Sequence, residues 1–124
     1  MELSGRELDV MNVLWERGSA TVSEVLEELP DELAYTTVLT ILQRLEDKGH
    51  VGHDSEGKAH RYLPLLEREE VQDSAIQRMT RKLFRDSPRL LMTRLLGRGE
   101  LSPDQLRELR TLLDQRLEDK EEER

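Results

Sequence analysis

Three short motifs mark where helices begin in this chain of 124 residues. Each motif places a serine or threonine three residues before a glutamate or glutamine. At that spacing each side chain accepts a hydrogen bond from the other residue's backbone N–H, which defines a capping box. The pairs are Ser4 with Glu7, Thr21 with Glu24, and Ser102 with Gln105. Such repeated caps predict a mainly α-helical protein.

The first half of the chain predicts three helices followed by a β-hairpin. The first helix begins at Ser4 and ends at Gly18, and the second begins at Thr21 and ends near Pro30. The third spans about residues 34–48 and closes at Gly49, the usual place for a left-handed cap. Residues 50–63 then form two short strands around a glycine turn. This order is that of a winged helix-turn-helix domain.

The third predicted helix has an apolar face and an opposite polar face. Threonine is a mediocre helix former, so three threonines on an exposed face call for a reason. In the major groove of DNA, hydroxyls reach phosphates or base edges and an arginine pairs with guanine. We predict that this face binds DNA and that two hairpin cations contact the flanking phosphates. The candidates are Thr36, Thr37, Thr40, Gln43 and Arg44 on the helix, and Lys58 and Arg61 on the hairpin. The alternative is that all of them are ordinary solvent-exposed residues.

The second half of the chain predicts three helices that cannot form a core alone. They span about residues 67–84, a segment that opens at Ser87-Pro88, and a segment that opens at Ser102-Pro103. Because only 3% of all residues are aromatic, these helices bury little surface by themselves. We expect them to pack against a second copy of the chain. The alternative is that the last leucine stripe folds back on the winged domain. The candidate dimerisation residues are Leu83, Leu91, Leu95, Leu106, Leu109 and Leu113.

These patterns predict a winged helix-turn-helix domain at residues 1–66 and a helical dimerisation region at residues 67–124. The chain has no cysteine, its start lacks an export signal, and no segment approaches about 20 apolar residues. We therefore expect a cytoplasmic protein without membrane insertion. Motifs for nucleotide binding, zinc proteolysis and serine hydrolysis are absent from the sequence, which predicts a non-enzyme without a cofactor.

The predicted hairpin contains two histidines, His53 and His60, one on each strand. If Glu56 and Gly57 form its turn, His53 lies directly opposite His60. Two nitrogen ligands make an incomplete zinc shell, so we predict no metal site at this pair.

The charge distribution runs against a DNA-binding domain. The chain has a net charge of −8, and residues 1–66 carry 6 Lys and Arg against 13 Asp and Glu. The acids gather on and after the second helix, whereas the predicted DNA surface offers Arg44, Lys48, Lys58 and Arg61. We predict weak non-specific binding and a log–log salt slope of about −5 for a dimer that neutralises about three phosphates per subunit.

A second basic element spans residues 78–98, with seven Lys and Arg against one Asp. These cations could follow flanking DNA. In the alternative, they shield the helical region and pair with the acidic tail at residues 118–123.

Five segments, in this order along the chain, resemble the penicillinase-repressor family of the BlaI/MecI type, which also includes copper-responsive repressors. They are LSGRELDVMNVLWERG from Leu3, TVSEVLEEL from Thr21, AYTTVLTILQRLEDKG from Ala34, GKAHRYLP from Gly57 and ELSPDQLREL from Glu100. The resemblance implies a winged-helix repressor that dimerises through its helical C-terminal region and binds an inverted-repeat operator. It places Thr36, Thr37, Thr40 and Arg44 at recognition-helix positions and Lys58 at a wing position.

Two departures limit what the resemblance implies. Copper-responsive members carry cysteine pairs near the C-terminus, and this chain has no cysteine. The best-known members are inactivated by a membrane metallopeptidase sensor that cuts an asparagine–phenylalanine bond. The matching pair here is Arg94-Leu95, so the resemblance implies such a partner without carrying over its cleavage site.

The resulting hypothesis is a sequence-specific transcriptional repressor that acts as a homodimer on an inverted-repeat operator. The helix at about 34–48 enters the major groove, and the wing at 50–63 lies on flanking backbone. The alternative is a dimeric protein-interaction adaptor whose winged domain does not bind DNA. A mobility-shift assay separates the two.

Overall fold

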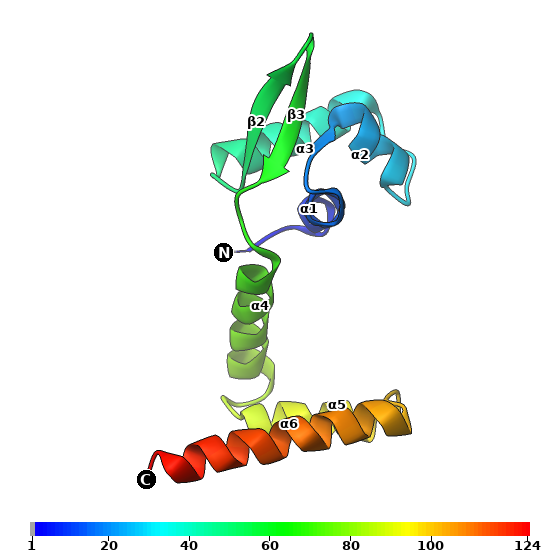
Figure 1. The fold of residues 1–124 in the computed structure, drawn as a ribbon. Helices are drawn as coiled ribbons and strands as arrows, with labels where there is room; N and C mark the ends of the chain where they lie inside the picture. The colour runs from blue at the N-terminus through cyan, green and yellow to red at the C-terminus, as the bar shows by residue number, and fades with distance from the viewer. Residues whose placement is uncertain (1) are drawn as a thin grey trace. The chain divides into compact units, whose positions relative to one another are not determined.

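The structure is a computed structural model that describes residues 2–124 (Figure 1). It divides into two compact units, which meet in sequence between Arg78 and Met79. The first unit is a winged helix-turn-helix domain with a three-stranded antiparallel sheet, and the second is helical. This confirms the predicted fold class. In the part of the chain that is described, no helix is long and apolar enough to cross a membrane.

The first unit contains six complete elements and the start of a seventh. They are α1 (Gly5–Arg17), β1 (Ala20–Thr21), α2 (Val22–Glu28), α3 (Tyr35–Asp47), β2 (Val51–Glu56), β3 (Ala59–Pro64) and α4 (Arg68–Leu83). The predicted helix starts are confirmed, because Ser4 and Thr21 both form capping boxes with their glutamates. Gly49 follows α3 with φ +81°, the left-handed conformation that its position after the helix predicts.

The sheet differs from the prediction in two ways. Its strand order is β1-β3-β2, so a two-residue strand that the sequence analysis missed pairs Ala20 with Tyr62. The hairpin turn consists of Gly57 and Lys58, and the register pairs His53 with Tyr62 rather than with His60. The predicted turn was therefore wrong by one residue. Gly57 has φ +61°, and a glycine with positive φ suits the first central position of a type II′ turn.

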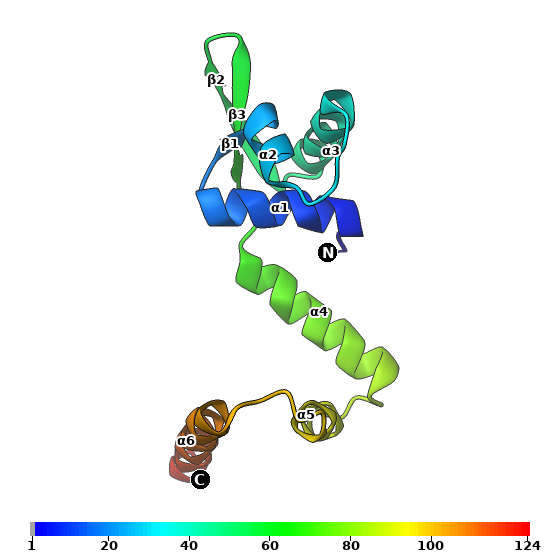
Figure 2. The ribbon, with the colours of Figure 1, turned by 90° about the vertical axis from the view of Figure 1, so that its right-hand side faces the viewer.

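An aliphatic core holds the first unit together. Val38, Leu42 and Leu45 of α3 are fully buried, as its apolar face predicts, and they pack with residues of α1 and α2. Tyr62 of β3 is the largest fully buried side chain and connects the sheet to this core. The tip of the β2–β3 hairpin extends past the helices (Figures 1 and 2).

The second unit contains the end of α4, then α5 (Pro88–Gly97) and α6 (Pro103–Glu122). Ser87 caps α5 and Ser102 forms a capping box with Gln105 at the start of α6, so both predicted helix starts are confirmed. Neither α5 nor α6 contains a buried residue. A unit that buries so little apolar surface internally is stable only when that surface packs against another one.

Candidate nucleic-acid interface

The polar face of α3 is open to solvent. All five of its candidate side chains are exposed: Thr36, Thr37, Thr40, Gln43 and Arg44. The hydroxyl of Thr40 donates a hydrogen bond to the carbonyl oxygen of Thr36 at 2.9 Å. The hydroxyl oxygen still has lone pairs with which to accept a hydrogen bond from a ligand. The helix therefore presents hydroxyl, amide and guanidinium groups along one side while its other side fills the core.

An ion pair between an exposed lysine and a nearly buried glutamate fixes the C-terminal end of α3 against α1. Lys48 Nζ donates to Glu7 Oε2 at 2.8 Å, and Glu7 is only 8% exposed. The hydrogen bond from Lys48 lowers the pKa of Glu7, and the backbone N–H of Ser4 lowers it further. Lys48 thus holds the helix in place, and its charge is already compensated.

The wing carries one exposed cation and one paired cation. Lys58 lies exposed in the hairpin turn. The Arg61 guanidinium lies 3.0 Å from both Glu24 and Glu56, which ties β3 to α2 and to β2. Within residues 2–124, Arg44 and Lys58 have no ion-pair partner. Of the four cations that the sequence places on the DNA surface, these two therefore remain available to a polyanion.

A cleft joins the candidate face of α3 to the wing. Its volume is about 240 Å³, and it brings Gln43 of α3 close to Lys58 of the turn. It is lined by Val22, Tyr35, Leu39, Gln43, Lys58, Ala59, His60 and Tyr62. Tyr35 and His60 were not among the candidates. The position of Tyr35 at the start of the helix, next to the candidate threonines, is the sequence signal that could have pointed to it.

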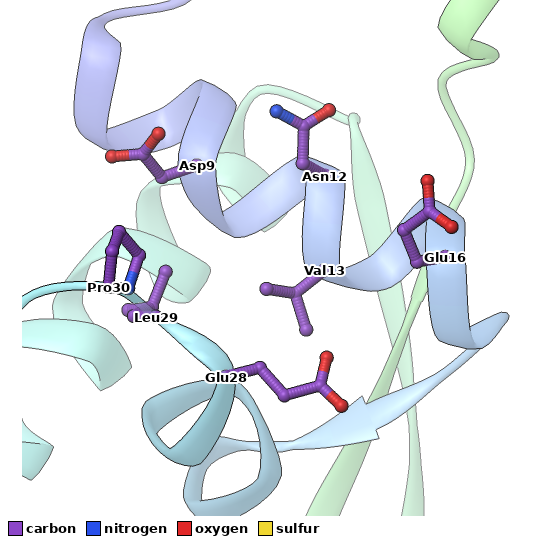
Figure 3. A pocket seen from close by; sticks show the side chains of 7 residues that line it. All are labelled: Asp9, Asn12, Val13, Glu16, Glu28, Leu29 and Pro30. Carbon is purple, nitrogen blue, oxygen red and sulfur yellow. The ribbon is translucent and has the colours of Figure 1, made fainter.

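Three acids of the first unit line a groove away from α3 and the hairpin. A groove of about 300 Å³ lies between α1 and the end of α2, and none of its lining residues belongs to α3 or the hairpin (Figure 3). They are Asp9, Asn12, Val13, Glu16, Glu28, Leu29 and Pro30. Two of the acids already have partners, because Glu28 pairs with Arg17 and Glu16 pairs with Arg68. The acids of this groove therefore lie away from the candidate DNA surface.

The basic stretch of residues 78–98 shows no ion pair to the acidic tail. Arg78 pairs with Glu2 at 2.5 Å, and Arg98 pairs with Glu100. Among the described residues, no salt bridge joins the stretch to residues 118–123.

The candidate dimerisation leucines leave much of their apolar surface uncovered. Leu83 is 73% exposed and Leu113 is 56% exposed, whereas Leu91 and Leu109 are half-buried. Leu95 and Leu106 are also exposed. A groove of about 310 Å³ brings Leu91 and Leu95 together with Met79 and Phe84. The other candidates are not gathered in that groove.

No ligand set for a metal is present within residues 2–124, because no three His, Cys, Asp or Glu side chains lie close enough to hold one ion.

Comparisons with known proteins agree with this geometry. The model of the penicillinase repressor family matches residues 3–115. The methicillin resistance regulatory protein MecI of Staphylococcus aureus is 25% identical over 117 residues, which is 93% of this chain and 95% of that protein. The penicillinase repressor of Bacillus licheniformis is 26% identical over 123 residues, with 98% and 96% coverage. The solution structure of the DNA-binding domain of the repressor BlaI matches with a TM-score of 0.51 and 34% identity. It covers 56% of this chain and 87% of that domain.

Proposed function

Because the chain belongs to the penicillinase-repressor family, it is a DNA-binding transcriptional repressor, and we propose that it acts as a homodimer on an inverted-repeat operator. Members of this family are regulators rather than enzymes. We place α3 in the major groove and the wing on the flanking backbone. The observation that supports this placement is the exposed polar face of α3, whose Gln43 lines one cleft together with Lys58 of the wing.

Under this proposal, Arg44 and Lys58, the two candidate cations without an ion-pair partner, have different roles. Arg44 lies on the groove face of α3, where a guanidinium pairs bidentately with a guanine. Lys58 lies on the wing, where a point charge contacts phosphate without regard to sequence. Because Arg44 is assigned to a base, one neutralised phosphate per subunit, that of Lys58, gives a log–log salt slope of about −2 for a dimer, shallower than the value of about −5 that the sequence suggests. The expected slope is shallower because Lys48 and Arg61 are already paired with acidic side chains.

Two available cations per subunit provide little affinity for DNA, and dimerisation provides the rest. Linking two half-sites raises the overall affinity well above that of one domain. The exposed leucines of α4, α5 and α6 support the proposal that this region forms the dimer interface. The homodimer then matches the two-fold symmetry of an inverted repeat. We propose a cytoplasmic location, where such an operator would be bound.

We also propose that a membrane metallopeptidase sensor is the inducing partner, as the family resemblance implies. Arg94 and Leu95 both lie within α5 and are exposed. A protease binds its substrate in an extended form, so cutting this bond would require α5 to unfold locally.

A mobility-shift assay with the upstream DNA of the gene tests the proposal. Arg44→Ala is expected to cost about 1 to 3 kcal/mol on the operator and to relax sequence preference at one position. Lys58→Ala is expected to weaken operator and random DNA alike, and to make the salt slope of a dimer shallower by about 2. Arg116→Ala on α6 removes the same charge far along the chain and serves as the matched control.

Equal losses on operator and random DNA for both variants would contradict the proposed division of roles. If the wild-type protein retards no DNA at any salt concentration, the dimeric adaptor becomes the better hypothesis.

A further inference from the structure

Two histidines stack on the face of the wing that is turned toward the core. The ring centroids of His53 in β2 and His60 in β3 are 4.2 Å apart, and the ring planes differ by 9°. They are diagonal neighbours in the hairpin, because His53 pairs with Tyr62 and Ser55 pairs with His60. Side chains alternate between the two faces of a strand, so both histidines share the face of the buried residues Val51 and Tyr62.

A carboxylate of α3 connects this stack to the recognition helix. Oε2 of Glu46 lies 2.6 Å from Nδ1 of His53, which joins α3 to β2. A carboxylate only accepts hydrogen bonds, so Nδ1 of His53 carries the hydrogen and donates it. Both side chains are about one-third exposed, which leaves the pair accessible to protons from solvent.

The other titratable groups around the stack come from three parts of the domain. Glu46 and Tyr35 belong to α3, Lys58 belongs to the turn, and Tyr62 belongs to β3. Burial raises the pKa of Tyr62, with smaller contributions from Glu46 and Tyr35, so this phenol stays neutral. Among side chains in general, imidazole is the one whose charge ordinarily changes between about pH 5 and 8.

His60 also lines the cleft between α3 and the wing, together with Gln43 and Lys58. A positive charge on the stack would therefore lie beside the surface that the proposed function assigns to DNA. A proton on His53 also turns its hydrogen bond to Glu46 into an ion pair, and charge-assisted hydrogen bonds are about twice as strong as neutral ones. A second proton on His60 would place two like charges 4.2 Å apart, which limits uptake to one proton per pair.

We propose that His53 is a positioning residue that fixes the wing to the recognition helix through Glu46, and that operator binding takes up about one proton at this histidine pair per half-site. The inference rests on the proposed function as a DNA-binding repressor. Because the DNA-bound form holds the proton more tightly, operator affinity rises as the pH falls. One proton per half-site changes the affinity at most about tenfold per pH unit.

The test measures affinity for the operator and for random DNA from about pH 8 to about pH 6 at constant salt. Wild-type protein is expected to bind each half-site about threefold to tenfold more tightly at the lower pH. His53→Gln keeps a donor for Glu46 and leaves His60 as the only imidazole of the pair, so the pH dependence should become weaker. Glu46→Gln leaves the stack in place and removes its counter-charge, so the dependence should weaken.

His50→Gln is the matched control, because it also removes one histidine but lies in the loop before β2, outside the stack. It should keep the wild-type pH dependence. A His53→Gln protein that keeps the full dependence, or a His50→Gln protein that loses it, would overturn the inference. If the wild-type protein does not prefer the operator to random DNA at any pH, the proposed function itself has failed.

A measurement on the wild-type protein tests the inference even if a variant does not fold. Long-range ¹H–¹⁵N correlation spectra show which ring nitrogen of neutral His53 carries the hydrogen. The inference requires a hydrogen on Nδ1, where Glu46 accepts it. A neutral ring that carries its hydrogen on Nε2 alone would refute the proposed link between wing and helix.

Discussion

The ion pair between Glu7 and Lys48 is expected to support both the first helix and the placement of the recognition helix. Glu7 Oε1 accepts the backbone N–H of Ser4 at 3.0 Å, and its Oε2 accepts Lys48 Nζ at 2.8 Å. Glu7→Gln keeps an oxygen for Ser4 but removes the charge that Lys48 requires. This substitution therefore isolates the contact between α1 and the end of α3.

The size of the effect follows from burial. A hydrogen bond to a charged group contributes about 1.5 to 3 kcal/mol. Glu7 is nearly buried, but the Lys48 side chain is 47% exposed, so water screens the pair and the lower end applies. We expect Glu7→Gln to lower the free energy of unfolding by about 1 to 1.5 kcal/mol. For a domain of this size that corresponds to a fall in Tm of about 5 to 10 °C.

The pH dependence gives an independent check with a definite sign. Because the pKa of Glu7 is lowered in the folded protein, its carboxylate stabilises the fold above the pKa of the unfolded chain. That stabilisation is lost as the pH falls below about 4.5 and through the lower folded pKa. The stability difference between wild type and Glu7→Gln should therefore shrink from about pH 5 downward.

Urea unfolding followed by the fluorescence of Trp15, the single tryptophan, measures these differences at constant protein concentration. Lys48→Met completes a double-mutant cycle, in which the coupling energy should exceed about 0.5 kcal/mol. Asp104→Asn breaks the exposed pair with Arg107 and should change stability by less than about 0.5 kcal/mol. A coupling energy near zero, or a Glu7→Gln effect that is unchanged at about pH 3, would refute the reasoning.

Two further predictions concern the second unit. Arg85 has φ +54°, a left-handed conformation that costs a residue with a side chain about 1 kcal/mol. Arg85→Gly is therefore expected to raise the free energy of unfolding by about 0.5 kcal/mol, whereas Lys82→Gly in the last turn of α4 should lower it by about 0.5 kcal/mol. Urea unfolding checks both, and a loss of stability in Arg85→Gly would contradict the backbone argument. Leu113→Glu is expected to weaken dimerisation at least tenfold in sedimentation analysis. Gln115→Glu adds the same charge on α6 as its control, and equal effects of the two would argue against a leucine interface.

The helix starts and the core face of α3 were predictable because they depend on residues close together in sequence. A capping box joins residues three apart, as in Ser4 with Glu7, and its hydrogen bonds do not depend on contacts with distant parts of the chain. The apolar residues Val38, Ile41, Leu42 and Leu45 share one side of α3 by helical periodicity alone. The same periodicity also predicted which residues of α3 lie on its exposed face.

The strand β1 and the hairpin register depended on contacts that periodicity does not specify. Two residues are too few to show the alternation of a strand, so the pairing of Ala20 with Tyr62 left no local signal. The turn could be placed at either of two adjacent pairs around Gly57, and the left-handed conformation of this glycine at the first central position selected one.

The charges that remain free to bind DNA were decided only by the tertiary structure. Sequence composition counts Lys48 and Arg61 as cations of the DNA surface, but folding places Glu7 against the first and Glu24 against the second. The partners are 41 and 37 positions apart in the chain, and a Coulomb interaction depends on distance in space. The amino-acid sequence by itself determined which side chains α3 exposes. The packing of α1, α2 and the hairpin around α3 determined which of the cations beside it are already neutralised.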